Sequence, residues 1–200
     1  MSGNNKASDA LRSIFGTSDR VTLSRSDLRG LARKPDLAQF VMATIVWGYT
    51  RGMRGNHVAN LMSHLGALTQ LLSEARTQPV AEWNTHYANV RQIDGIGLST
   101  YTKFLNFLSV QVHGHAALIL DDRIIRVASQ GVFTELAPLR ELSNYNAVRS
   151  YPSYLMHMHS VANSLEVSSE AVEFFLFEFG LNLKPHPPNR SFATILSSFA

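Results

Sequence analysis

Apolar residues recur at helical spacing along almost the whole chain, and no other feature of the sequence restricts the fold as strongly. The clearest stripe follows Asn56, a residue type that can cap a helix. Its members are Val58, Leu61, Met62, Leu65, Leu68, Leu71 and Leu72. Similar patterns predict helices over residues 36–53, 80–91, 101–112, 146–165 and 169–179, and from 121 onward. Strand signals are few, and the aliphatic run of residues 118–120 is too short to predict a strand. The pattern therefore predicts an all-α fold with eight or more helices.

The composition is that of a packed globular protein and excludes several kinds of site. Apolar residues make up 45% of the chain, yet no apolar run reaches the roughly 20 residues that span a bilayer. The first ten residues lack the apolar core of a signal peptide. The chain contains no cysteine, which excludes disulfides, thiol nucleophiles, cysteine-ligated zinc and iron–sulfur clusters. We therefore expect a cytoplasmic protein that has no membrane span.

The charge of the chain suits a polyanionic partner. The net charge is +3 and the pI is about 9.4. Basic residues are frequent near the N-terminus: Arg12, Arg20, Arg25, Arg29, Arg33 and Lys34, followed by Arg51 and Arg54. The alternative interpretation is that the first group forms a solvated helical face.

The segment from Ile93 to Gly97 lies between two predicted helices and carries two glycines. Glycine permits a tight turn and lets the backbone approach a phosphate closely. The N-terminus of the following helix adds free N–H groups, and Ser99 or Thr100 can add a hydroxyl donor. Such an element holds a phosphate without reading a base. The alternative is an ordinary turn between helices.

A second motif follows the next helix, where an aliphatic residue precedes an aspartate that opens an Arg-Val-Ala helix. With both motifs present, residues 90–130 resemble the helix-hairpin-helix DNA glycosylase superfamily. The matching positions are Ile93, Gly95, Ile96, Gly97, Asp121, Arg126, Val127 and Ala128. Within the superfamily, residues 102–105 and 119–121 look most like the compact prokaryotic branch with an 8-oxoguanine-glycosylase fold. Some members of that branch act in defence against phages with modified DNA bases.

The resemblance implies one domain over residues 1–200. The helix-hairpin-helix would span about 80–112, the loop and aspartate helix about 113–132, and C-terminal helices 144–200. Residues 184–190 contain three prolines and should be extended, with a short helix from Ser191 after them. We expect a monomer that binds double-stranded DNA.

Asp121 is the candidate catalytic carboxylate. Breaking an N-glycosidic bond builds positive charge on the deoxyribose, and a nearby carboxylate stabilises that state or activates a nucleophile. An aspartate at the start of a helix is also an ordinary N-cap, and the two roles are compatible. Asp122 is the rival, because the assignment depends on the register set by the aliphatic residue before Asp121.

The identity of the nucleophile is open. Family members that also cleave the strand carry a lysine soon after the hairpin, and alignment on Gly95 and Gly97 puts Ser99 at that position. Lys103, however, lies one helical turn later on the same face and 18 residues before Asp121, close to the separation in lysine-bearing members. Alignment from the hairpin puts a serine at the lysine position and so favours water as the nucleophile, whereas the separation from Asp121 favours Lys103. The alternative for Lys103 is a solvated side chain or a phosphate contact.

The remaining assignments concern the base and the DNA backbone. An extruded base needs a stacking surface, for which Trp47, Tyr49 and Tyr101 are the candidates, although most aromatic residues at helical spacing belong to the core. Arg51, Arg123 and Arg126, with Ser99 and the hairpin glycines, are the candidate DNA contacts. The pairs His113/His115 and His157/His159 lack a third ligand pattern, so no catalytic metal is expected. In the family, the hairpin often holds a monovalent cation on backbone carbonyls.

The sequence therefore predicts a DNA glycosylase that excises a damaged or modified base, in base excision repair or in antiviral defence. A non-catalytic helix-hairpin-helix module that only binds DNA is the alternative from another class, and a helical protein-interaction domain is a third. The sequence does not identify the base.

Overall fold

The computed structural model describes residues 3–49 and 55–183, and this part of the chain is helical almost throughout. Its helices are α1 (Gly3–Phe15), α2 (Arg25–Ala32), α3 (Ala38–Gly48), α4 (His57–Ser63), α5 (Leu65–Thr77), α6 (Trp83–Val90), α7 (Leu98–Phe107), α8 (Asp122–Ser129), α9 (Ala147–Ser164) and α10 (Ser169–Phe179), with short 3-10 helices η1 (Thr134–Leu139) and η2 (Gly180–Asn182). Strands β1 (Gln111–Val112) and β2 (His115–Ala116) form one small antiparallel hairpin. The predicted all-α fold is confirmed. None of the described helices is long and apolar enough to cross a membrane.

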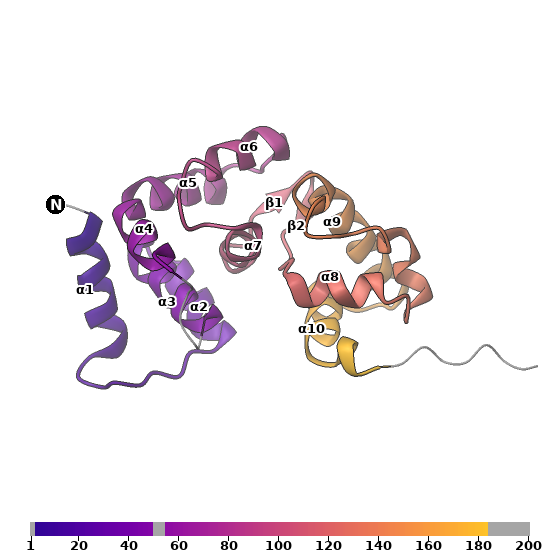
Figure 1. Ribbon diagram of the computed structural model, residues 1–200, viewed down its shortest axis with the longest axis horizontal. Coiled ribbons are helices and arrows are strands. Elements are labelled where there is room, and N and C mark those ends of the chain that lie inside the picture. The colour runs from indigo at the N-terminus through magenta and orange to yellow at the C-terminus, as the bar shows by residue number, and fades with distance from the viewer. Residues whose placement is uncertain (1–2, 50–54, 184–200) are drawn as a thin grey trace, which may run out of the picture.

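Helix α7 lies at the centre of the molecule. In Figure 1, α1–α5 form one side and α8–α10 the other, with α6 and α7 between them. Residues 100–107 of α7 are all buried. The ring of Phe104 meets Phe40 of α3 edge-on at 5.9 Å, so α7 packs tightly against the N-terminal side. On the other side, its Thr102 and Asn106 side chains bond the chain that leads into α8.

Residues 117–120 are buried without being part of a sheet or helix, so their backbone polar groups need partners elsewhere. Two tyrosines of α9 supply them: Tyr151 donates to the carbonyl of Leu118 and Tyr154 to that of Ile119, both at 2.8 Å. Burial raises the pKa of both phenols well above the usual range, which keeps them neutral donors. These bonds fix the segment that leads into α8.

The ends of several helices differ from the sequence prediction. The helix predicted over 36–53 starts at Ala38, after the Asp36 carboxylate has accepted the Ala38 N–H, and ends at Gly48. The long stripe after Asn56 is divided between α4 and α5 at His64. The helix predicted through Val112 stops at Phe107, because Ser109 adopts a φ of 56° and the chain turns into the β-hairpin.

Other boundaries are confirmed. Helix α10 spans the predicted residues, and Asp121 is the N-cap of α8. The predicted extended tail and the helix from Ser191 lie outside the described residues.

A buried ion pair joins the two sides of the molecule. Arg25 of α2 donates to both carboxylate oxygens of Glu173 on α10, at 3.1 and 3.2 Å, and also bonds Glu170 at 3.3 Å. The Glu173 side chain has no exposed surface, whereas that of Arg25 is 20% exposed. Burial raises the pKa of Glu173, and the neighbouring guanidinium opposes the rise. The carboxylate is therefore held in place by one cation from the opposite side.

Replacing Arg25 with alanine should destabilise the fold, because Glu173 is left buried without its partner. We expect the free energy of unfolding at about pH 7 to fall by about 3 kcal/mol. Loss of Arg25 raises the pKa of Glu173 further, so below that pKa the native state binds a proton that the unfolded chain does not hold. The deficit should therefore shrink as the pH is lowered to about 5.

Urea denaturation at the two pH values measures this. Arg12→Ala is the matched control, since its contact with Asp9 is exposed and should contribute little. An Arg25→Ala deficit that is the same at both pH values would contradict this account of Glu173.

Candidate active site

Lys103 and Asp121, two residues far apart in the sequence, face the same cavity. It has a volume of about 350 Å³ and is enclosed by α2, α3, α7, α10 and the chain that enters α8. Its lining residues are Arg25, Trp47, Gly48, Lys103, Ile119, Asp121, Glu173 and Phe177. This volume lies within the range of small-molecule sites, roughly 300–1,000 Å³.

Lys103 is a buried lysine whose amine points back along α7. It is 8% exposed, and its Nζ donates to the Ser99 hydroxyl at 2.8 Å and to the Ser99 carbonyl at 3.3 Å. A Cβ at Gly48 would lie 3.4 Å from Lys103 Cδ, so α3 packs directly on the lysine stem. Burial lowers the pKa of Lys103, and the negative charges of Asp121 and Glu173 oppose that change. The amine is thus more readily deprotonated than that of an exposed lysine.

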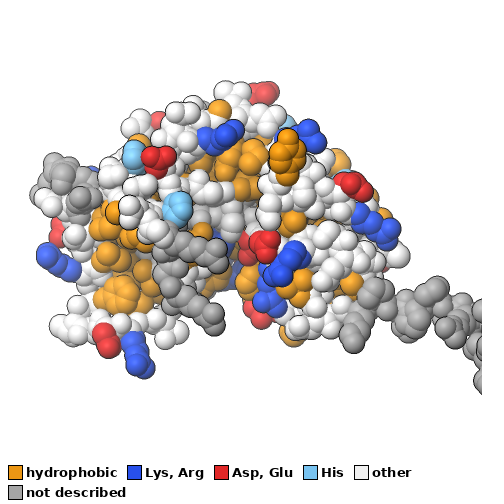
Figure 2. Space-filling model, viewed as in Figure 1, with side chains coloured by type: hydrophobic (Ala, Val, Ile, Leu, Met, Phe, Trp, Pro, Cys, Tyr) orange, Lys and Arg blue, Asp and Glu red, His pale blue; other side chains and the backbone are white. Residues whose placement is uncertain are grey.

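Asp121 combines a structural bond with access to the cavity. Its Oδ1 accepts the backbone N–H of Ile124 at 3.0 Å, which is the N-cap bond of α8. Asp122, the rival in the sequence, is exposed and does not line this cavity. It pairs with Arg126 at 3.1 Å and accepts from Asn144 at 3.0 Å, and Figure 2 shows acidic and basic side chains together over α8. The geometry favours Asp121 as the residue that can meet a ligand in the cavity.

The hairpin glycines have different surroundings. Gly95 has a φ of +91°, and a Cβ there would lie 2.6 Å from the carbonyl oxygen of His57. Gly97 is exposed in an extended conformation that any residue adopts, and a Cβ there would meet nothing within 4 Å. Gly97 also provides no side-chain cap for the first N–H groups of α7. Gly95 is therefore required by packing against α4, whereas Gly97 leaves an open surface over the helix N-terminus.

The three residues predicted to form the base pocket do not all line this cavity. Trp47 lines the cavity, and its ring contacts Phe107 edge-on at 5.3 Å. Tyr49 is outside the lining and forms a hydrogen bond through its hydroxyl to Thr100. Tyr101 has no exposed surface and bonds His86 at 2.6 Å, so it belongs to the aromatic core and not to the cavity. Its ring packs beside Trp83. Aromatic residues at helical spacing more often belong to the core than to a binding site, and Tyr101 follows that tendency.

The predicted backbone contacts also vary. The Ser99 hydroxyl accepts a hydrogen bond from the Lys103 amine. Arg123 lies over the Phe177 ring at 5.1 Å and donates to the Glu178 carbonyl, so it is turned toward α10. Arg126 is exposed and paired with Asp122. Arg51 lies outside the described residues.

Sequence reasoning missed the Arg25–Glu173 pair and Phe177 as parts of the site. A signal was present, because Glu173 interrupts the apolar run of α10, where a charged residue needs a buried partner. Its partner lies 148 residues away in the chain, and spacing cannot reveal it. Among the described residues, no group of three or more His, Asp or Glu is arranged to hold a metal ion.

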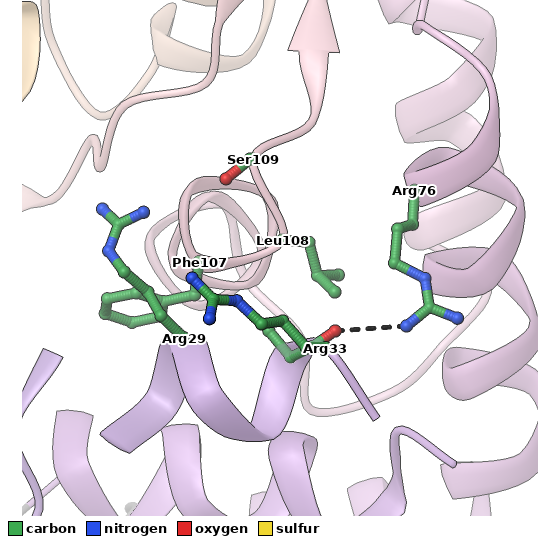
Figure 3. Close-up of a pocket in the computed structure, with 7 residues that line it drawn as sticks. Arg29, Arg33, Arg76, Phe107, Leu108 and Ser109 are labelled. Carbon is green, nitrogen blue, oxygen red and sulfur yellow. Dashed lines mark hydrogen bonds between the residues drawn. The ribbon is translucent and has the colours of Figure 1, made fainter. Parts of the chain in front are cut away.

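A second pocket lies where α2, α5 and α7 end. Figure 3 shows Arg29, Arg33 and Arg76 around it, and its volume is about 310 Å³. Arg76 donates to the backbone carbonyls of Ala32 and Lys34, at 3.1 and 2.8 Å, and Arg29 pairs with Glu170. Two of these arginines therefore already have partners, and one of them caps the end of α2. The lining of this pocket contains neither a carboxylate nor a lysine amine, unlike the cavity of Lys103.

Comparison with known proteins identifies a family. A family model described as "Putative 8-oxoguanine DNA glycosylase OGG-like protein" matches residues 2–177. No curated protein and no solved structure matches the chain.

Substitutions at Gly95 and Gly97 should separate an effect on packing from an effect on phosphate binding. Gly95→Ala should lower the free energy of unfolding by roughly 1–3 kcal/mol, because of its positive φ and the clash with His57. Gly97→Val should change stability by less than about 0.5 kcal/mol but weaken binding to duplex DNA of any sequence, since its side chain would hold a phosphate away. Denaturation and DNA titration measure the two effects. A folded Gly97→Val variant with unchanged affinity would rule out the hairpin as the anchor.

Proposed function

The chain belongs to this OGG-like family, and from that premise we propose that it is a DNA glycosylase that cleaves the N-glycosidic bond of an extruded base. The observation that carries the proposal is the common cavity of Lys103 and Asp121. A nucleophile with a lowered pKa and a carboxylate are the groups that this reaction needs at C1′.

DNA binding begins at the hairpin. The open backbone around Gly97 and the N-terminus of α7 are suited to a phosphate, and the family's monovalent cation would bind to carbonyls of the same turn. The reacting bond is inaccessible inside a duplex, so the nucleotide must rotate out of the stack and enter the cavity. Since Lys103 lies on the helix that the hairpin begins, a phosphate held there sets the position of the sugar relative to the amine.

Asp121 acts on the sugar. As the bond to the base lengthens, positive charge develops at C1′ and O4′, and a fixed carboxylate beside these atoms stabilises it. The N-cap bond through Oδ1 orients the group before substrate arrives, so no reorganisation is needed during the reaction.

Lys103 supplies the nucleophile. Its uncharged amine attacks C1′ while the electron pair of the N-glycosidic bond leaves with the base. The amine gives up one proton and the departing base gains one, so charge balances. Opening of the sugar ring with protonation of O4′ leaves a protonated imine between Nζ and C1′. Removal of a proton at C2′ then expels the 3′ phosphate, which is the associated strand cleavage.

The base occupies the remainder of the cavity. Trp47 and Phe177 provide apolar surface, and the guanidinium of Arg25, whose side chain is 20% exposed and is held by Glu173, offers donors to the edge of the base. The substrate is either an oxidised purine such as 8-oxoguanine, which means repair, or a modified phage base, which means defence. Incubation with duplexes that contain each class, followed by mass spectrometry of released bases, tests the function and separates the two roles. Salt-sensitive binding without base release would support the non-catalytic DNA-binding module instead.

Asp121→Asn should lower base excision by orders of magnitude and leave DNA affinity nearly unchanged, because the amide keeps the cap but not the charge. Asp122→Asn is the matched control, since it changes a neighbouring exposed carboxylate that the cavity does not include. Single-turnover excision and DNA titration measure both variants. Normal excision by Asp121→Asn together with loss in Asp122→Asn would reverse the assignment.

Borohydride trapping on an active substrate tests Lys103. Wild type should form a permanent protein–DNA crosslink by reduction of the imine, and Lys103→Gln should form none. Because burial lowers the pKa of Lys103, the uncharged fraction grows as the pH rises and is half-maximal below 10.5, the pKa of an ordinary lysine. The crosslinking rate should therefore rise with pH and level off below that value. A crosslink that survives in Lys103→Gln would identify another amine as the nucleophile, and robust excision by Lys103→Gln without a crosslink would leave water as the nucleophile.

A further inference from the structure

One aromatic side chain lies almost wholly outside the fold. Tyr145, in the loop before α9, is 97% exposed, whereas Leu165, the next most exposed large apolar residue described, is 57% exposed. Tyrosine normally covers its ring and leaves only the hydroxyl in water. A ring presented in this way has its whole face available to a partner.

The loop that carries Tyr145 is held rigidly by its neighbours. The Asn146 side chain accepts the Ser143 N–H at 2.8 Å and donates to the Glu141 carbonyl at 2.7 Å. Asn144 donates to Asp122 at 3.0 Å. With both adjacent residues bonded in this way, little backbone entropy remains to be lost when Tyr145 meets a partner.

The same bonds place Tyr145 beside the candidate active site. Asn144 contacts the first residue of α8, and Asp121, the residue before it, lines the cavity. Arg149 is exposed in the first turn of α9 and follows Tyr145 by four residues. The loop before Tyr145 also contains an acidic residue, Glu141. The loop of Tyr145 is therefore attached to the start of α8, at one edge of the cavity, and an exposed arginine follows it in the chain.

We propose that Tyr145 stacks on a DNA base that becomes unstacked when the target nucleotide is extruded, and that Arg149 contacts the adjacent phosphate. A base is the partner that fits a single, flat, fully exposed ring, because each base has a π-face of matching shape. A protein partner would instead require a contiguous apolar patch around the ring, whereas the chain neighbours of Tyr145, Asn144 and Asn146, are polar. The extrusion step rests on the proposed function, whereas the stacking contact can be measured without catalysis.

The experiment compares affinity for a duplex with one stable abasic-site analogue and for the same duplex intact. Such an analogue leaves the opposite and flanking bases unstacked without any excision. Tyr145→Ala should lose about tenfold or more in affinity for the abasic duplex and little for the intact one. Tyr145→Phe should bind like wild type, because the ring remains. Leu165→Ala is the control, since it removes an exposed apolar side chain at the far end of α9. Thermal unfolding checks that each variant is folded.

The outcomes separate this contact from the proposed function. If the abasic preference depends on Tyr145 but wild type releases no base from the substrate panel, the stacking contact stands and the glycosylase assignment fails. If wild type excises a base and Tyr145→Ala binds the abasic duplex as wild type does, the stacking contact is wrong and the glycosylase assignment stands. Wild type that binds neither duplex overturns both.

Discussion

The arrangement of the site depends on polar side chains buried on α7. Thr102, Lys103 and Asn106 lie inside the molecule, and buried polar groups must find partners there. Thr102 accepts the Leu120 N–H at 3.1 Å, and Asn106 donates to the Ala117 carbonyl at 3.0 Å. These bonds bind the chain before α8 to α7, so that α8 begins beside Lys103 and its N-cap carboxylate faces the same cavity. The central helix thereby creates the constellation, although Lys103 and Asp121 share no local sequence relationship.

The same burial that builds the site sets its electrostatics. Lys103 loses solvation and its pKa falls, while Glu173 loses solvation and its pKa rises. A neighbouring opposite charge opposes each of these pKa shifts: Asp121 opposes the shift of the amine, and Arg25 opposes that of the carboxylate. An amine with a lowered pKa and a buried carboxylate thus coexist at one cavity of about 350 Å³. The Arg25–Glu173 pair also joins α2 to α10, so the wall of the cavity and the contact between the two sides of the molecule are one structure.

What the sequence could predict follows from the range of each interaction. The helices, the Asp121 cap and the glycine hairpin are set by residues within a few positions of one another, and periodicity and capping chemistry reveal them. The β-hairpin was missed because Ser109 and His113 adopt positive φ without being glycine. Tyr101 was assigned to the base pocket because periodicity does not distinguish a core face from a cavity face. Glu173 and Phe177 were missed because their partners, Arg25 and Arg123, are distant in sequence, and only the packing of α10 brings them together.

The conflict between the two spacings has a partial geometric explanation. Spacing from the hairpin places the family lysine at Ser99, and spacing to Asp121 places it at Lys103. Side chains on a helix lean toward its N-terminus, so a lysine reaches back over the turn that precedes it. The Lys103 amine does so and lies 2.8 Å from the Ser99 hydroxyl. The Lys103 amine therefore occupies the level of position 99, while its backbone lies one turn later. Under our proposal, this lean brings the Lys103 amine one turn nearer to a phosphate held at the N-terminus of α7, which reduces the conflict between the two spacings without removing it.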